Sequence, residues 1–416
     1  MVIGAGAAGL LAAARAAERG RRTLLIEKNR KPGVKILISG GTRCNLTHDA
    51  DAAGIVSAFG PQGRFLHSAL AALSPRALVA LVEQCGVATK TEPGGKIFPR
   101  SDRAIDVQRA LLAHAVRCGV RCELGAPVRG IARRENRFEL ASERGPIVAE
   151  RVVVTTGGRS YPGCGTTGDG YAWLAALGHT IVPPRPALVP LRTPRTALHA
   201  LAGLTLPDVR VSVSGRVRRS PRAVCRGSLL FTHGGLSGPA VLNVSREAVP
   251  DDPAAGPDAY APLELDFVPD EREADLAAWL DREIARDGRR TFATIFREKL
   301  PRRLADCLAG GTEEAAAPPP GMLWFRPSAE APRAVRAQAV RCLKQFRVPI
   351  SGDLGFAKAE VTAGGVALDE IHSGTMESRL CPGLFVAGEI LDLDGPIGGY
   401  NFQAAFSTGW LAGDRI

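Results

Sequence analysis

Residues 1–27 read MVIGAGAAGLLAAARAAERGRRTLLIE, and this stretch predicts the fold of the first domain. A short apolar strand leads into GAGAAG (Gly4–Gly9), a helical run follows, and a second apolar strand ends at Glu27. In such a βαβ unit the first glycine permits a tight turn, Gly6 lets backbone approach a pyrophosphate at the helix N-terminus, and the last glycine allows close helix–strand packing. A carboxylate at the end of the second strand accepts hydrogen bonds from the adenosine ribose. The sequence therefore predicts a dinucleotide site in a Rossmann-like α/β domain.

A second glycine cluster follows the apolar run Arg151–Thr155. Gly163, Gly165 and Gly168 also have GxGxxG spacing, which could mark a separate nicotinamide domain. Seven residues separate the strand from the first of these glycines, and no acidic residue ends the next predicted strand, His179–Val182. Because a nucleotide fingerprint needs both features, we expect one permanently bound dinucleotide and a second that only visits.

The end of the chain returns to the first domain. Leu384–Ala387 has the pattern of a buried strand, and GEILDLDGPIGGYNFQAAFSTGWLAG (Gly388–Gly413) follows as a loop and a helix. One fingerprint, with a distant strand, loop and helix on the same sheet, is typical of an FAD protein rather than of an NAD dehydrogenase.

The loop within this segment carries both acids and glycines. Glu389, Asp392 or Asp394 could accept hydrogen bonds from ribityl hydroxyls, or could lie on a solvated turn. Gly398 and Gly399 could direct backbone N–H groups at the charge that a reduced flavin carries near N1, or could simply begin the last helix.

The pattern of apolar and polar residues changes from about Ala187 onward. Short alternating runs predict a β-rich insertion, and helices are expected at Asp270–Gly288 and Thr291–Ala309. Gly310–Gly321 is rich in Pro and Ala and is interpreted as a connector. We therefore expect a cofactor domain built from residues 1–186 and 351–416, with an inserted substrate domain at 187–350.

A further helix is predicted at Ala331–Arg347, with two distinct faces. At about 100° per residue one face is apolar and the other is basic. The apolar face holds Val335, Ala339, Leu343 and Phe346, and the basic face holds Arg333, Arg336, Arg341, Lys344 and Arg347. Such a face suits the phosphates of RNA, although a solvated surface has the same pattern.

Composition limits the class of protein. The net charge is +11, and the 53 basic residues comprise 45 Arg and eight Lys, as expected from a GC-rich coding sequence or from a polyanionic partner. The nine cysteines are scattered without a CxxC or a paired Cys/His cluster, so we expect no metal site and no disulfide framework. No apolar run reaches the length of a membrane span, and no basic leader precedes the alanine-rich start. A cytoplasmic protein without a membrane partner is expected; the oligomeric state is left open.

Several stretches in order along the chain resemble the BaiN/RdsA-type family of NAD(P)/FAD-dependent oxidoreductases. They are GAGAAGLLAA at the start, PGVKILISGGTRCNLTH (Pro32–His48), GKIFPRSDRA (Gly95–Ala104), TTGGRSYPGCGTTGDGY (Thr155–Tyr171), LFTHGGLSGPAVL (Leu230–Leu242), AEVTAGGV (Ala359–Val366) and GEILDLDGPIGGYNFQAAFSTG (Gly388–Gly409). The resemblance implies an FAD-binding domain of the two-dinucleotide-binding type, with an inserted β-barrel and a small helical subdomain.

The resemblance also implies site residues. The loop after the second strand would lie along the flavin, and Thr42 stands where the family more often has a third glycine. Cys44, Arg43 and Tyr400 are candidates for proton donor or carbonyl polariser, although Cys44 could equally be a small buried hydrophobe. His233 is either a turn residue or a substrate contact. The expected cofactor-binding residues are Gly4, Gly6, Ala7, Ala8, Gly9, Glu27, Lys28, Lys35, Ser39, Gly40, Gly41, Thr42, Asn45, Thr156, Gly157, Gly388, Glu389, Asp394, Gly398, Gly399 and Asn401.

Three functions follow from these patterns. The first is an FAD enzyme that uses NAD(P)H as a transient reductant to reduce an activated C=C bond, with a uridine of 23S ribosomal RNA as the candidate substrate and dihydrouridine as the product. The second is a small-molecule enone reductase or amine oxidase, which needs no basic surface. The third is a flavin-holding RNA-binding protein without turnover.

Overall fold

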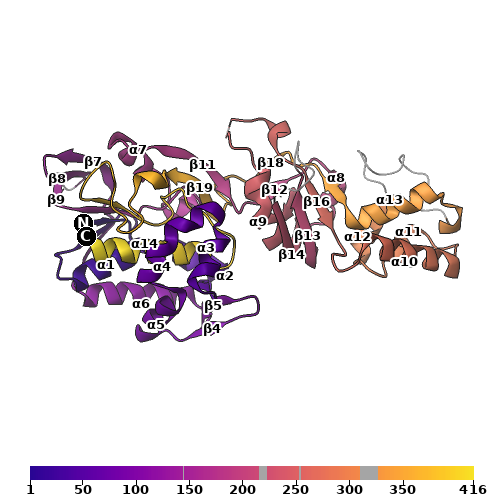
Figure 1. Ribbon diagram of the computed structural model, residues 1–416, viewed down its shortest axis with the longest axis horizontal. Helices are drawn as coiled ribbons and strands as arrows, with labels where there is room; N and C mark the ends of the chain where they lie inside the picture. The colour runs from indigo at the N-terminus through magenta and orange to yellow at the C-terminus, as the bar shows by residue number, and fades with distance from the viewer. Residues whose placement is uncertain (144, 215–222, 253, 310–326) are drawn as a thin grey trace. The chain divides into compact units, whose positions relative to one another are not determined.

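The computed structural model describes residues 1–143, 145–214, 223–252, 254–309 and 327–416. The chain forms two compact units (Figure 1). Unit 1 comprises Met1–Pro186 and Phe356–Ile416, and unit 2 comprises Ala187–Gly355. The connector expected at 310–321 lies outside the described residues.

A five-stranded parallel sheet forms the centre of unit 1, in the order β20-β10-β1-β2-β6. Val2 pairs with Val153 on one side and with Leu25 on the other, so the first strand is in the middle. The strands are β1 (Val2–Ile3), β2 (Leu24–Glu27), β6 (Arg121–Leu124), β10 (Val152–Val154) and β20 (Leu384–Val386). All residues of β10 and β20 are buried, as in parallel strands covered on both faces. The α/β class with a Rossmann-type sheet is confirmed.

Three helices share one hydrophobic core with one face of this sheet. They are α1 (Ala7–Glu18), α6 (Ala104–Arg117) and α14 (Tyr400–Arg415). Helix α14 approaches α1 so closely that a Cβ at Gly409 would lie 2.2 Å from the Ala8 carbonyl oxygen. A Cβ at Gly413 would lie 2.3 Å from that of Ala12. Only glycine fits at these two positions of α14, so the C-terminal helix is fixed on the fingerprint helix.

The remaining elements of unit 1 surround this centre. The other face of the sheet packs with residues of α7 and of the sheet β7-β8-β9. The further helices are α2 (Val34–Thr42), α3 (Ala52–Ala58), α4 (His67–Ala72), α5 (Pro75–Gln84) and α7 (Asp169–Ala176). The further strands are β3 (Thr47–His48), β4 (Thr89–Thr91), β5 (Lys96–Pro99), β7 (Val128–Arg134), β8 (Arg137–Ser142), β9 (Ile147–Ala149), β11 (Ile181–Ala187) and β19 (Val361–Val366).

Unit 2 contains a seven-stranded sheet in the order β17-β16-β13-β14-β15-β12-β18. Its edge strands, β17 (Phe346–Val348) and β18 (Gly352–Asp353), are separated by only three residues of chain, so their adjoining ends lie within about 14 Å. The sheet is therefore curled, and the closed β-barrel that the resemblance implies stays a prediction. Its other strands are β12 (Leu191–Arg192), β13 (Thr205–Val213), β14 (Ala223–Thr232), β15 (Gly235–Ser237) and β16 (Leu263–Asp266).

The helices of unit 2 differ from the sequence expectation in one place. They are α8 (Thr196–His199), α9 (Pro239–Ala248), α10 (Glu273–Arg286), α11 (Phe292–Phe296), α12 (Arg302–Ala309) and α13 (Arg333–Lys344). The single helix expected at Thr291–Ala309 is wrong, because α11 ends before Pro301 and α12 begins after it. Proline has no backbone N–H and clashes with the preceding turn, so it interrupts a helix.

The basic face expected on Ala331–Arg347 is also partly wrong. Helix α13 ends at Lys344, and Phe346 pairs with Leu265 in the sheet, which places Arg347 on a strand. The Lys344 ammonium donates to Asp266 Oδ2 at 2.6 Å and to the carbonyls of Val268 and Glu271, and its side chain is 13% exposed. Lys344 therefore holds the subdomain together instead of facing a phosphate.

Within the described ranges, no single helix is both long and apolar enough to span a membrane. One bent pair, Gly60–Ala72 with Pro75–Gln84, meets the length and composition only when the two segments are taken together.

The contact of α14 with α1 can be tested with Gly409→Ala. Alanine favours a helix by about 1 kcal/mol over glycine, but here its Cβ would meet backbone that cannot yield, and overpacking costs about 1–3 kcal/mol. We expect a lower midpoint of denaturant unfolding. Gly374→Ala is the control, because a Cβ there meets nothing within 4 Å. Equal midpoints for the two variants would contradict this account of the packing.

Candidate functional site

The glycine fingerprint adopts the geometry that its spacing predicts. Gly4 has φ +100°, and a Cβ there would lie 2.6 Å from the Thr155 carbonyl oxygen. A Cβ at Gly9 would lie 1.8 Å from the Gly4 carbonyl oxygen, so the third glycine is required for packing. A Cβ at Gly6 would meet nothing within 4 Å. The turn is therefore tight on its protein side and open at Gly6, where a ligand can approach the backbone.

Helix α1 begins directly after Gly6 with Ala7 and Ala8, whose side chains are buried. No side chain caps this helix, and no acidic residue lies in its first turn. The first N–H groups of a helix have no intrahelical partner and lie at the positive end of its dipole. This terminus can therefore bind an anion such as a pyrophosphate.

Glu27, the last residue of β2, is held beside this turn. Its carboxylate accepts hydrogen bonds from the Ala5 N–H at 2.7 Å and from the Asn29 N–H at 2.8 Å. Each oxygen takes one of these bonds, and a carboxylate oxygen can accept more than one. Glu27 is thus fixed against the fingerprint loop and retains capacity to accept from a ribose hydroxyl.

A hollow of ≈ 390 Å³, open to solvent, lies next to the fingerprint. Ile3, Ile26 and Val128 contribute apolar walls, and Lys28 lies at its edge, bonded to Thr167 at 2.6 Å and to Asp169 at 2.5 Å. The other lining residues are Gly4, Ala126, Thr156, Gly165, Thr167, Asp169 and Trp173. Apolar walls with a few polar groups suit a planar heterocycle.

The segment after β10 borders this hollow. The Thr156 hydroxyl oxygen is buried and has no hydrogen-bond partner among the residues that the structure describes. Gly157 follows with φ +72°. A buried polar atom without a partner is uncommon in a folded protein, so this hydroxyl fits a nucleotide that would complete its bonding.

A second polar cluster joins four segments that are distant in sequence. The Lys35 ammonium on α2 donates to Ser160 Oγ at 2.6 Å and to Glu389 Oε2 at 2.7 Å. Glu389 Oε1 accepts from Ser160 Oγ at 2.8 Å and from the Thr362 N–H at 3.0 Å. Lys35 and Glu389 are both mostly buried and compensate each other's charge. Ser160 and Thr362 were not assigned a role from the sequence, although both lie in the quoted motifs.

The stretch Ser39–Asn45 is bent by residues in left-handed conformations. Helix α2 is interrupted at Ser39, Gly40 and Gly41, and Gly40 and Gly41 have φ +56° and +68°. Thr42 and Cys44 also have positive φ, +68° and +64°, which costs an ordinary residue roughly 1–2 kcal/mol each. The expected loop is thus a short helix followed by a strained turn. Strain of this kind gathers at functional sites.

The three residues after this turn have different environments. Arg43 pairs with Glu92 at 2.7 Å and lies 4.0 Å above the Phe98 ring. Cys44 is fully buried within the hydrophobic core, and burial raises the pKa of its thiol to about 12. Asn45 is buried, and its Oδ1 has no hydrogen-bond partner within the described residues. The placement of Cys44 favours its packing role over proton donation.

The C-terminal loop lies against this turn. Gly399 has φ +96°, and a Cβ there would be 2.5 Å from the Thr47 carbonyl oxygen. Asn401 closes the loop on itself through bonds of 2.8 Å with both the N–H and the carbonyl of Gly395. Asn401 therefore shapes the loop, and Asp394, expected to bind ribityl hydroxyls, is buried.

Tyr400 begins α14 and stacks on His48, with ring centroids 4.6 Å apart. His48 Nδ1 lies 3.1 Å from the Gly398 carbonyl oxygen, which ties the two motifs together. Partial burial raises the pKa of the Tyr400 phenol. His48 was not singled out in the sequence, although it ends the motif at Pro32–His48. His233, by contrast, lies exposed in the turn between β14 and β15 of unit 2.

Most of the predicted site residues thus meet in unit 1. Four of them follow the carboxyl ends of parallel strands and therefore lie at one edge of the sheet. They are Gly4 after β1, Lys28 after β2, Thr156 after β10 and Gly388 after β20. The carboxyl edge of such a sheet is where α/β folds bind their ligands. The arrangement fits a dinucleotide cofactor bound along this edge.

Comparison with known proteins identifies related chains. A family model described as "HI0933-like protein Rossmann domain" matches residues 1–415. The chain is 33% identical over 421 residues to the ribosomal RNA dihydrouridine synthase of Escherichia coli (strain K12), covering 100% of this chain and 97% of the relative. A protein of that name from Haemophilus influenzae is 30% identical over 417 residues, covering 99% and 96%.

A relative with a different name is equally long. The chain is 31% identical over 422 residues to the 3-dehydro-bile acid delta(4,6)-reductase of Clostridium scindens, covering 99% of this chain and 97% of the relative. The family expected from the sequence and its Rossmann-type FAD-binding fold are thus confirmed, and the chain belongs to the HI0933-like family.

Proposed function

We propose that this protein is an FAD-dependent oxidoreductase that reduces a uridine of 23S ribosomal RNA to dihydrouridine, with NAD(P)H as its transient reductant. One observation carries the cofactor assignment: the fingerprint turn is open only at Gly6, with Glu27 fixed beside it. The reaction and substrate rest on the 33% identity to a ribosomal RNA dihydrouridine synthase.

The relatives' names describe one chemistry on two substrates. Uridine has a C5=C6 double bond conjugated to a carbonyl, and in a 3-dehydro bile acid with 4,6 double bonds the diene is conjugated to the C3 carbonyl. When bound, FAD supplies hydride chemistry to such a system, and NAD(P)H renews it. The protein must bind the cofactor, orient the substrate and provide a proton for the carbon beside the carbonyl.

Different residues at the sheet edge would bind different parts of the cofactor. The N-terminus of α1 at Gly6 would bind the pyrophosphate, Glu27 the adenosine ribose, and the hollow beside Lys28 the adenine. Lys35 and Glu389 would contact the other half of the cofactor, because their cluster lies at the ends of β10 and β20. Their mutual pairing keeps both side chains in place before the cofactor arrives.

Tyr400 is the best placed of the three proton-donor candidates. Cys44 is fully buried, and Arg43 is paired with Glu92 and does not release its proton near neutral pH. Tyr400 is only half-buried and begins the helix after Gly399, so its phenol can reach a substrate. Burial raises the pKa of this phenol, which keeps it protonated and able to donate.

The net charge of +11 supports RNA as the substrate, since polyanions are attracted by such an excess. Arg333 and Arg341 remain exposed on α13 as local contributors. The 31% identity to a bile-acid reductase supports a second candidate, reduction of a small-molecule enone.

The substrate can be tested by comparing the nucleoside composition of ribosomal RNA from cells with and without this gene. We expect dihydrouridine in 23S RNA to disappear with the gene and to return with the wild-type copy. Unchanged dihydrouridine, together with reduction of steroid enones by the purified protein, would favour the second candidate. Absence of NAD(P)H consumption with any substrate would leave the flavin-holding RNA-binding protein.

Cofactor binding can be tested at Glu27. We expect the purified protein to be yellow, and Glu27→Ala to weaken FAD binding by tens of fold, because a hydrogen bond to a charged group contributes about 1.5–3 kcal/mol. Glu143→Ala is the control, since this glutamate is exposed and pairs with Arg129. A colourless wild-type protein that takes up no FAD would overturn the proposal.

The proton donor can be tested by comparing Tyr400→Phe with Cys44→Ala. Tyr400→Phe should retain FAD and its reduction by NAD(P)H but form product at least tenfold more slowly, as expected when an acid catalyst is removed. Cys44→Ala should stay within a few fold of wild type, because the thiol only packs. Measured with FAD-saturated enzyme, the opposite order would assign the proton to Cys44.

The pH dependence supplies a second readout. The phenol donates only in its protonated form, and its pKa is raised, so wild-type turnover should persist through the ordinary tyrosine pKa of about 10 and fall only above it. The alkaline fall should be absent from the residual activity of Tyr400→Phe. A fall near neutral pH would point to a different acid.

A further inference from the structure

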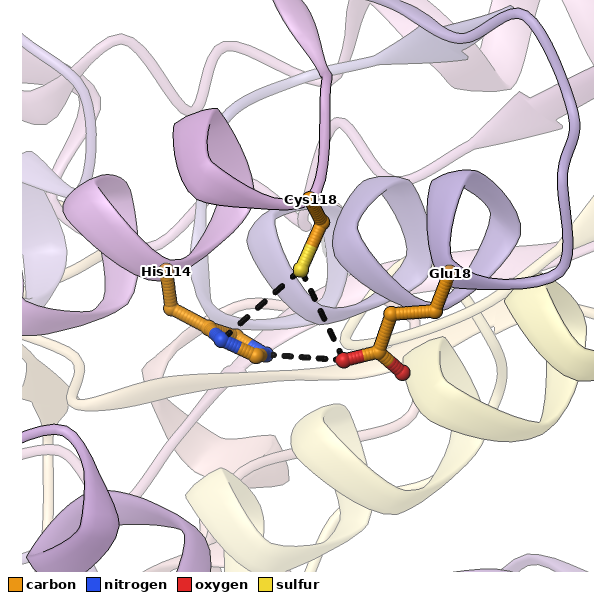
Figure 2. A group of neighbouring side chains, drawn as sticks. All are labelled: Glu18, His114 and Cys118. Carbon is orange, nitrogen blue, oxygen red and sulfur yellow. Dashed lines mark hydrogen bonds and ion pairs between the residues drawn. The ribbon is translucent and has the colours of Figure 1, made fainter.

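Three potential metal ligands meet on the outer side of α1 and α6, away from the fingerprint turn. Figure 2 shows Glu18, His114 and Cys118 with their functional groups directed at one another. Glu18 is the last residue of α1, His114 lies in the last turn of α6, and Cys118 is the C-cap of α6. Residues four apart on a helix share a face, so α6 presents His114 and Cys118 together to the end of α1.

Glu18 Oε1, Cys118 Sγ and one ring nitrogen of His114 lie within 4.8 Å of one another, and only one of the two ring nitrogens would bind an ion. Glu18 Oε1 lies 3.4 Å from His114 Nε2 and 3.5 Å from Cys118 Sγ, and Sγ lies 3.8 Å from His114 Nδ1. Zinc bonds of about 2.0–2.3 Å at tetrahedral angles place such ligand atoms roughly 3.4–3.6 Å apart. Among the described residues, no other group of three metal-ligating side chains brings its ligand atoms within 4.8 Å of one another.

Hydrogen bonding leaves one buried atom of this cluster, His114 Nε2, without a partner of good geometry among the described residues. The Cys118 thiol donates to Glu18 Oε1, and the His114 Nδ1–H can donate to the sulfur, so the remaining ring nitrogen, Nε2, carries no proton and faces the carboxylate. Glu18 Oε2 is bound by Arg15 at 3.2 Å, which leaves Oε1 for the cluster. A cation would satisfy all three groups at once.

We propose that Glu18, His114 and Cys118 bind a zinc ion. Thiolate, imidazole and carboxylate are all accepted by Zn²⁺, and their mixture disfavours the oxygen-seeking Mg²⁺ and Ca²⁺. On binding, the Cys118 S–H proton passes to solvent, and the two anionic ligands neutralise the ion. A water molecule would complete the tetrahedral coordination, as it does at zinc sites with three protein ligands.

The position of the site indicates a structural role. Helix α1 has 12 residues and is therefore about 18 Å long, which separates Glu18 at its end from the cofactor turn at its start. The ion would join the ends of α1 and α6, and its binding energy would add to the stability of the folded state. This inference does not depend on the proposed function.

Metal binding tests the proposal directly. The full-length protein, treated with a chelator and dialysed, should bind one equivalent of Zn²⁺ in calorimetric titration with zinc chloride, and its unfolding temperature should rise with added zinc. Cobalt chloride should give the absorption of a tetrahedral thiolate-bound Co²⁺ in a difference spectrum. Cys118→Ser should abolish that thiolate band and weaken zinc binding a hundredfold or more, beyond the loss seen for outer ligands.

Matched variants complete the test. Cys122→Ser is the control, because it removes a neighbouring thiol outside the cluster and should bind zinc as wild type does. Glu18→Gln removes an exposed ligand and keeps the proposal testable should Cys118→Ser fail to fold. If wild type, Cys118→Ser and Glu18→Gln bind zinc equally weakly and show no thermal shift, the three residues are only a hydrogen-bonded cluster.

Discussion

The near-contact of α14 with α1 is the constraint on which the rest of unit 1 depends. Two glycines of α14, Gly409 and Gly413, allow its backbone to reach that of Ala8 and Ala12. An apolar side chain at either position would push the helices apart and withdraw the loop that precedes α14. That loop carries Gly399, which is packed on the backbone of β3, so its position follows from the helix contact.

The proposed cofactor site is therefore assembled from the two segments of unit 1 that flank unit 2 in the sequence. The first segment supplies the fingerprint turn and Glu27, whereas Glu389 and Tyr400 arrive with the second. Lys35 and Glu389 are mostly buried, and neither charge is compensated by the other unless both segments are present. Since an unpaired buried charge costs several kcal/mol, the pair favours the one arrangement in which the two halves of the site meet.

Local sequence patterns predicted those parts of the structure that local backbone geometry determines. The turn at Gly4–Gly9 and the return at Leu384–Ala387 were recognised because spacing and apolar runs define them. The end of the helix at Lys344 was missed, because it depends on Asp266, a residue in another strand. The meeting of Glu18 with Cys118 was missed for the same reason. Contacts between residues that are distant in sequence produce no periodic pattern of residue types.

The sheet order also has a consequence for biosynthesis. Strand β10 is flanked by β1 on one side and by β20 on the other, and β20 leaves the ribosome only after the whole of unit 2. Unit 2, encoded entirely between the two segments, can complete its fold first. Until β20 has been synthesised, one edge of β10 is unpaired. An unpaired strand edge can pair with another chain and lead to aggregation. A chain truncated before residue 384 would be expected to need chaperone protection and to be degraded.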